Sequence, residues 1–343
     1  MTQAPPAGLA GLHPAYFALV MATGIVSIAS ELVGVHEVAV ALFAVNLGFY
    51  PLLWILTIAR LVKHRDRVRA DLSHHGRAVG FFTTVAATCV LGSQCLVIGG
   101  SVTAACVLWI AGIALWAVLI YGIFALLTVK AEKPSLTDGI NGGWLISVVA
   151  AQSVAVLGAQ LAPSFGEHAA EALVFSLAMW LGGAMLYIWI SSLIFYRYMF
   201  FTMQPSDLAP PYWINMGAAA ITTLAGTMLI SASPHSPVID QLLPFIRGLT
   251  FLWWATATWW IPMLLILGIW RHGVRKFPLR YDPLYWGAVF PLGMYTVCTA
   301  RLSTAVEASY LISISRVFVY IALAAWALVM LGMVLHLARR SSK

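Results

Sequence analysis

Long runs of apolar residues follow one another along this chain, separated by short polar connections. The runs do not alternate apolar and polar positions, as the strands of a membrane barrel would. A run of about 20 apolar residues is long enough to cross a bilayer as a helix, and a helix satisfies its own backbone hydrogen bonds in hydrocarbon. The pattern predicts ten spanning helices, at residues 13–32, 38–62, 79–100, 102–129, 142–161, 169–201, 212–232, 245–270, 285–306 and 314–338.

Composition supports the same fold class. Apolar residues make up 61% of the chain and charged residues only 9%, which is far outside the range of a soluble globular domain. We therefore expect an all-α integral membrane protein in which residues 1–343 form a single ten-span transmembrane domain.

Basic residues occur mainly in alternate connections. Examples are Arg65, Arg67 and Arg69 after the second predicted span, and Arg271 and Arg275 after the eighth. Because Lys and Arg concentrate in cytoplasmic loops, both termini are expected on the cytoplasmic side of the cell (plasma or inner) membrane. The net charge of +7 is then a signal of topology, and without a recognition motif it does not indicate a nucleic-acid partner.

Two classes of span differ in residue type. Tryptophan lies within the even-numbered spans, whereas the odd-numbered spans are rich in Gly, Ala, Ser and Thr. This alternation predicts five helical hairpins, each with one inner and one outer helix. Small residues let helices approach closely and hydroxyls can line a narrow polar path, although these residues can equally serve packing alone. The candidate path-lining residues are Thr23, Gly24, Gln94, Ser153, Asn215, Thr222 and Gly293.

The spans lack the groups that most membrane enzymes use. No Asp, Glu, Lys or His lies near the middle of a predicted span, and the four cysteines have no metal-ligand spacing. We therefore expect no catalytic residue, no metal site and no cofactor. A membrane-embedded enzyme, such as an acyltransferase or a quinone-linked oxidoreductase, would need convergent groups of these types.

Arg301 is the one charge deep in a predicted span. It follows Phe290 by eleven residues, so at about 100° per residue the two side chains lie about 20° apart around the helix and about 16 Å apart along it. On a pore-lining face Arg301 would attract anions. It could instead extend toward the membrane surface or pair with Glu307. Pro291 predicts a kink beside Phe290, where a constriction could form.

Three sequence blocks resemble one family of membrane proteins. They are His13-Pro14 with Met21 to Ser27, Pro211 to Gly217, and Tyr285 to Tyr295. Each is similar to the corresponding span of the tellurite-resistance/C4-dicarboxylate transporter family. That family includes the slow-type (voltage-dependent) anion channels, the malate permease and the sulfite exporters.

The resemblance implies more than the residues alone. It implies a homotrimer in which each subunit has a central pore of odd helices inside an outer ring of even helices. It also implies a phenylalanine gate just before a proline in the ninth helix, a position that Phe290 and Pro291 occupy here.

Two transport functions are expected from these observations. The first is an anion channel or permease for small anions such as tellurite, sulfite, monovalent anions or C4-dicarboxylates, crossing the lipid bilayer. The alternative is a proton-coupled carrier of C4-dicarboxylates such as malate, although no mid-membrane carboxylate or histidine is present to carry the proton.

Overall fold

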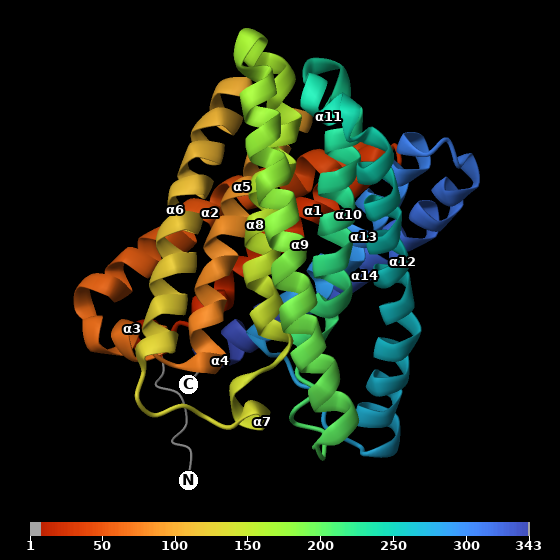
Figure 1. The fold of residues 1–343 in the computed structure, drawn as a ribbon. Helices are drawn as coiled ribbons and strands as arrows, with labels where there is room; N and C mark the ends of the chain where they lie inside the picture. The colour runs from red at the N-terminus through yellow and green to blue at the C-terminus, as the bar shows by residue number, and fades with distance from the viewer. Residues whose placement is uncertain (1–7, 342–343) are drawn as a thin grey trace.

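The computed structural model describes residues 8–341, and the regular elements within that range are all helices (Figure 1). Eight helical stretches there are long and apolar enough to cross a membrane. One of them, Gly142–Phe200, contains two of the predicted spans, separated by a turn at Gly166 that has a φ of 56°. The predicted span at residues 285–306 forms a helix but is not among the eight, because Arg301, Pro291 and several hydroxyls lower its mean hydropathy.

Five helices form a closed inner ring, in which each packs against the next and the last packs against the first. They are α1 (Ala18–Leu32), α5 (Thr83–Val97), α8 (Ile146–Leu161), α10 (Ile214–Ala232) and α13 (Trp286–Ala305). Their side chains are surrounded by protein. Within Pro210–His235, the stretch that includes α10, 94% of the residues in an 18-residue apolar segment are buried.

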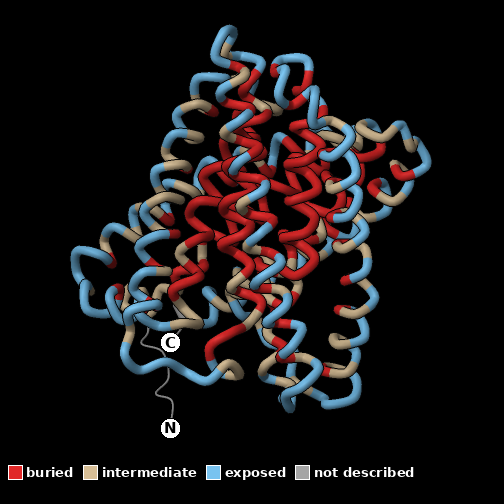
Figure 2. Tube along the Cα trace, in the orientation of Figure 1, coloured by how far each residue is buried: buried red, intermediate tan, exposed pale blue. Residues whose placement is uncertain are grey.

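Five longer helices surround this ring, and each packs against the inner helix that precedes it. They are α2 (His36–Lys63), α6 (Val102–Val129), α9 (Ala169–Phe200), α12 (Leu243–Ile269) and α14 (Ile312–Ser341). Within Leu243–Val274, the stretch that includes α12, only 22% of the residues in an 18-residue apolar segment are buried. Figure 2 shows the resulting contrast between a buried centre and an exposed periphery.

Aromatic residues of the outer helices join the two layers by hydrogen bonds. Each outer helix reaches a second inner helix in this way, so every inner helix is held from two sides. A buried polar tip needs a partner, and backbone carbonyls and hydroxyls of the inner helices supply it. The pairs are Tyr50–Thr88 (2.8 Å), Trp109–Val154 carbonyl (3.0 Å), Trp180–Thr222 carbonyl (2.8 Å), Trp254–Thr299 (3.0 Å) and Trp326–Thr23 (3.0 Å).

A short 3-10 turn precedes every inner helix. The five turns are η2 (Pro14–Phe17), η3 (Val79–Phe82), η4 (Gly142–Leu145), η6 (Pro210–Trp213) and η9 (Pro283–Tyr285). They contact one another in the same cyclic order as the helices that they begin. The inner helices are therefore parallel, with all five N-termini at one end of the ring.

Shorter helices lie in the connections. They are α3 (Arg65–Leu72), α4 (His75–Ala78), α7 (Leu136–Gly139) and α11 (Pro237–Gln241). Figure 1 shows α4 and α7 at one end of the bundle and α11 at the other. The basic connections with α3 and α4 therefore share an end with the N-termini of the inner helices.

An ion-pair network fixes the connection between α2 and α5. Arg60 on α2 contacts the Asp71 carboxylate at 2.7 Å, and Arg77 contacts it at 2.5 Å. Burial acts to raise the pKa of Asp71, but the hydrogen bonds from Arg77 and Arg60 outweigh it and lower that pKa. Asp71 therefore stays charged, and α3 and α4 are held against the end of the bundle.

Candidate functional site

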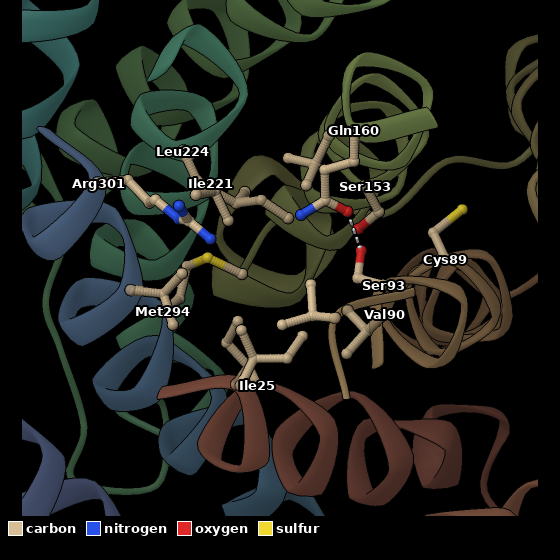
Figure 3. Close-up of a pocket in the computed structure, with 14 residues that line it drawn as sticks. Ile25, Cys89, Val90, Ser93, Ser153, Gln160, Ile221, Leu224, Met294 and Arg301 are labelled. Carbon is tan, nitrogen blue, oxygen red and sulfur yellow. Dashed lines mark hydrogen bonds between the residues drawn. The ribbon is translucent and has the colours of Figure 1, made fainter. Parts of the chain in front are cut away.

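A cavity lies inside the ring, toward the C-terminal ends of the inner helices, and we call it the outer cavity (Figure 3). All five inner helices contribute to its wall. The volume open to the centres of water molecules is about 20 Å³, which is room for about one water. Its lining residues are Ile25, Ile28, Cys89, Val90, Ser93, Val97, Ser153, Val156, Gln160, Ile221, Leu224, Met294, Val297 and Arg301.

Two nitrogen groups in the outer cavity, the Arg301 guanidinium and the Gln160 amide NH2, are hydrogen-bond donors that have no acceptor among the described residues. Arg301 points its guanidinium into the cavity from α13, opposite Gln160 on α8 (Figure 3). Ser93 donates its hydroxyl proton to Gln160 Oε1 at 2.7 Å, which leaves the Gln160 amide group available. Ser153 donates to the Val149 carbonyl at 2.7 Å. None of the described residues that line the cavity carries a carboxylate, so its wall suits an acceptor-only, negatively charged guest.

Arg301 is not paired with Glu307 in this structure. The ion pairs found within residues 8–341 do not include one between these two side chains, and Glu307 is exposed in the turn after α13. Of the arrangements that the sequence left open, the structure shows a guanidinium directed into the cavity.

A second, larger cavity lies at the opposite end of the ring, among the five 3-10 turns, and we call it the inner cavity. Its volume by the same measure is about 320 Å³. Arg197, Asp138 and Asp207 provide its charged side chains, and Arg197 lies 3.6 Å from Asp207. His13, which caps the 3-10 turn η2 and lies just before the first apolar helical stretch Pro14–Leu32, also lines it. Burial and the nearby charge of Arg77 lower the pKa of His13 to about 4, so this side chain is neutral at physiological pH.

The ring is closed between the two cavities. On α8 the inner cavity reaches Ile146 and the outer cavity begins at Ser153, so about 10 Å of helix separates them. The corresponding stretch at α13 runs from Leu284 of η9 to Met294 of α13 and contains Phe290. Phe290 is completely buried, and it is among the largest side chains in the molecule to be so. The predicted gate residue thus lies in the stretch that separates the cavities.

Proline 291 also lies in this stretch and packs against α10. A Cβ added to Gly217 would lie 2.7 Å from the Pro291 ring, so these helices touch where only glycine leaves room. Close packing at this point fixes the turn of α13 that carries Phe290.

Three of the other predicted path-lining residues form hydrogen bonds between helices. Thr23 accepts the Trp326 hydrogen bond, and Gln94 accepts one from Asn46 at 2.7 Å. Asn215 donates to the Tyr198 hydroxyl at 3.2 Å. Their place in the structure is therefore between helices, away from the outer cavity.

Threonine 222 and the two predicted glycines also serve packing. Thr222 donates to the Ala218 carbonyl at 2.7 Å. A Cβ on Gly24 would lie 2.5 Å from Val90, and one on Gly293 would lie 2.9 Å from Ile25. These positions let α1 approach α5 and α13.

Ser93 and Gln160 are the polar lining residues that the sequence analysis missed. Ser93 directly precedes Gln94, which was selected instead. A helical wheel could have distinguished the two only with the position of the ring axis known, because every face of α5 is buried. Gln160 is the last residue but one of α8, and only Ser153 was selected from this span.

Comparison with known proteins places the chain in a family. The sequence profile of the voltage-dependent anion channel family matches residues 11–334. A transporter of unassigned substrate from Methanocaldococcus jannaschii is 30% identical over 289 residues, covering 82% of this chain and 81% of that protein.

Other relatives extend the range of similarity. A sulfite efflux pump of Trichophyton rubrum is 24% identical over 348 residues, covering 94% of this chain and 89% of that protein. A membrane protein of Mycobacterium tuberculosis is 39% identical over 153 residues, covering 45% of this chain and 77% of its own. The family predicted from the three sequence blocks is confirmed, and this chain belongs to the voltage-dependent anion channel family of membrane transport proteins.

Proposed function

We propose that this protein is a channel or permease that moves small inorganic oxyanions, with sulfite as the first candidate, along the axis of the inner ring. The observation that carries this proposal is the outer cavity, where the Arg301 guanidinium and the Gln160 amide have no acceptor partner and no carboxylate competes for them. Donors without acceptors in a narrow, low-dielectric site favour an anion.

The direction of the inner helices supports the same conclusion. Their N-termini, where helix dipoles are positive, surround the inner cavity and favour anions there. Their C-termini are at the outer end, where the partial charge is negative and would repel an anion. Arg301 offsets this repulsion from within the outer cavity. Helix dipoles at the inner end and Arg301 at the outer end therefore favour an anion, and Arg197 offsets part of the negative charge that Asp138 and Asp207 add to the inner cavity.

Phe290 is the proposed gate. It is fully buried in the stretch between the cavities, and that stretch must open before an ion can pass. Pro291 removes a backbone hydrogen bond in the same turn, which lowers the cost of rearranging it.

The substrate is proposed from size and charge. A single guanidinium beside a cavity with room for about one water suits a small oxyanion better than a dicarboxylate. The similarity to a sulfite efflux pump points the same way. Tellurite shares this chemistry, whereas coupled C4-dicarboxylate transport would need a proton-carrying group at membrane depth, and the described residues that line the outer cavity include no carboxylate or histidine.

The proposed arrangement in the membrane follows the predicted one. Ten spans form five hairpins, with the basic connections and both termini on the cytoplasmic side of the plasma or inner membrane. The inner cavity is then cytoplasmic and the outer cavity external. We further propose a homotrimer, whose test is the mass of the purified complex.

Flux into proteoliposomes tests the function. Vesicles containing the protein are loaded with buffer, and uptake of labelled sulfite, tellurite and malate is followed with and without a pH gradient. Sulfite uptake that follows the membrane potential and needs no pH gradient supports the proposal. Malate uptake that requires an inward proton gradient would establish the coupled carrier instead.

A further inference from the structure

The gate-bearing helix α13 is open to the molecular surface along one short stripe. From Trp286 to Ala300 every residue is buried except Ala288 and Leu292, which are half-buried. These two are four residues apart and therefore share a face. Phe290 lies between them in sequence and about 200° around the helix from each, so it faces the opposite way.

A lateral groove leads from the periphery to this stripe. It lies between α13, α14 and the segment before η9, and its volume is about 350 Å³. Ala288, Val289 and Leu292 form its floor, with Ala325, Leu328, Val329 and Gly332 of α14 on one side. A second cavity of about 240 Å³ adjoins it and shares Trp213, Leu279, Tyr285 and Ala288. Leu279 and Leu328, which line the lateral groove, are more than two-thirds exposed.

The chemistry of the groove changes at one end. Its walls along α13 and α14 are apolar, whereas Arg280 lines the end nearest the basic connection after α12. Arg280 is exposed, and none of the ion pairs or hydrogen bonds found within residues 8–341 involves its side chain. Arg275 and Lys276 are exposed in the same connection, and Asp282, which caps η9 through the Leu284 amide, is its only acidic residue.

We propose that this groove binds an anionic phospholipid of the cytoplasmic leaflet, with one acyl chain on the α13 stripe and the phosphate at Arg280. An apolar slot with a basic group at its membrane-surface end matches that amphipathic shape. The groove faces outward from a membrane-embedded bundle, so bilayer lipid reaches it directly. Because its floor is the reverse face of the turn that carries Phe290, an acyl chain there supports the closed position of that turn.

Lipid retention tests the proposal independently of transport. The purified protein is delipidated in detergent, titrated with phosphatidylglycerol or phosphatidylcholine, and analysed by native mass spectrometry. Arg280→Gln should weaken phosphatidylglycerol binding about fivefold, because that is the usual contribution of one arginine to binding an anionic lipid surface. Phosphatidylcholine binding should be unchanged. Arg67→Gln is the matched control, because Arg67 is another exposed arginine of the cytoplasmic connections.

A second variant tests the apolar part of the site. Ala288→Trp fills the groove floor and should reduce binding of both lipids. Equal phosphatidylglycerol binding by wild type, Arg280→Gln and Ala288→Trp would overturn the proposal. So would a loss of subunit association in Ala288→Trp with lipid binding unchanged, because the groove would then be covered by a second copy of the chain.

Discussion

Arg301 shows how one residue can change the chemistry of an apolar ring. A cation at membrane depth is costly unless it meets water, a counter-charge or a ligand. Here it faces a cavity whose other free polar group is an amide donor, and its nearest acidic neighbour in sequence, Glu307, is not paired with it. We therefore propose that a bound anion offsets the free-energy cost of placing this charge inside the bundle.

Replacing Arg301 with glutamine should weaken anion transport while leaving assembly intact. One fixed charge in a narrow, low-dielectric path should alter the rate several-fold, most strongly at low salt. The measurement is sulfite flux into proteoliposomes at low and high ionic strength. Arg301→Lys keeps the charge and should retain most of the flux.

The control for this substitution is Arg316→Gln. Arg316 is exposed on α14, near the same end of the bundle but outside the cavity. If both variants lower flux equally, a general effect of positive surface charge replaces the cavity as the explanation. Unchanged flux in Arg301→Gln would remove Arg301 from the anion path.

At the scale of elements, glycines set the spacing of the inner ring. Gly217 on α10 faces Pro291 on α13 so closely that a Cβ would lie 2.7 Å from the proline ring. We expect Gly217→Ala to lower the free energy of unfolding by about 1–3 kcal/mol, the usual effect of overpacking a core. Thermal melting in detergent measures this change.

Gly182→Ala provides the comparison for Gly217→Ala. Gly182 lies on the outer helix α9, and a Cβ there would meet nothing within 4 Å. This substitution should be neutral or stabilising, because alanine favours a helix over glycine. Similar melting temperatures for the two variants would contradict the close contact between α10 and α13.

The 3-10 turn before α1 makes the protein sensitive to acid through His13. Its side chain accepts the Ala15 N–H at 3.1 Å and lies near Arg77, Asp71 and Arg60. Its folded-state pKa, about 4, is below the unfolded value of 6.5, so its contribution is fully present above pH 6.5 and is lost as the pH falls toward 4. At pH 5 the loss is about 2 kcal/mol.

His13→Asn should remove this part of the acid sensitivity. Asparagine can also accept the Ala15 N–H but does not titrate. Melting temperatures measured from pH 8 to pH 5 should therefore fall less in the variant than in wild type. Parallel curves would mean that His13 keeps an ordinary pKa in the folded protein.

At the scale of the whole molecule, the sequence predicted an all-helical membrane protein, and the regular elements within residues 8–341 are helices. The alternation of Trp-rich and small-residue spans matches the outer and inner helices, because aromatic residues of the outer layer need polar partners on the inner one. The same bonds engage hydroxyls such as that of Thr23, which accepts the Trp326 N–H and does not line the outer cavity. Their partners lie on other helices, so only the assembled ring shows which side chains remain free.

On α13, helical periodicity was a better guide than residue type to the side chains that line the outer cavity. The face shared by Phe290 and Arg301 was predicted from helical geometry, and Met294, Val297 and Arg301 do line the outer cavity. Ser93 and Gln160 were not predictable in this way, since nothing in a uniformly buried helix distinguishes its axial face from its packing faces. Their pairing depends on how α5 meets α8.

The most direct test of the central claim is the current carried by Phe290→Ala in a planar bilayer under a salt gradient. Removing the ring should raise the current at least about tenfold, equivalent to lowering a barrier by 1.4 kcal/mol, and the reversal potential should lie near that of the anion. Phe82→Ala is the control, because Phe82 is equally buried but its ring packs against Phe124 of α6. A Phe290→Ala current no larger than that of wild type, or a cation-selective reversal potential, would contradict the account.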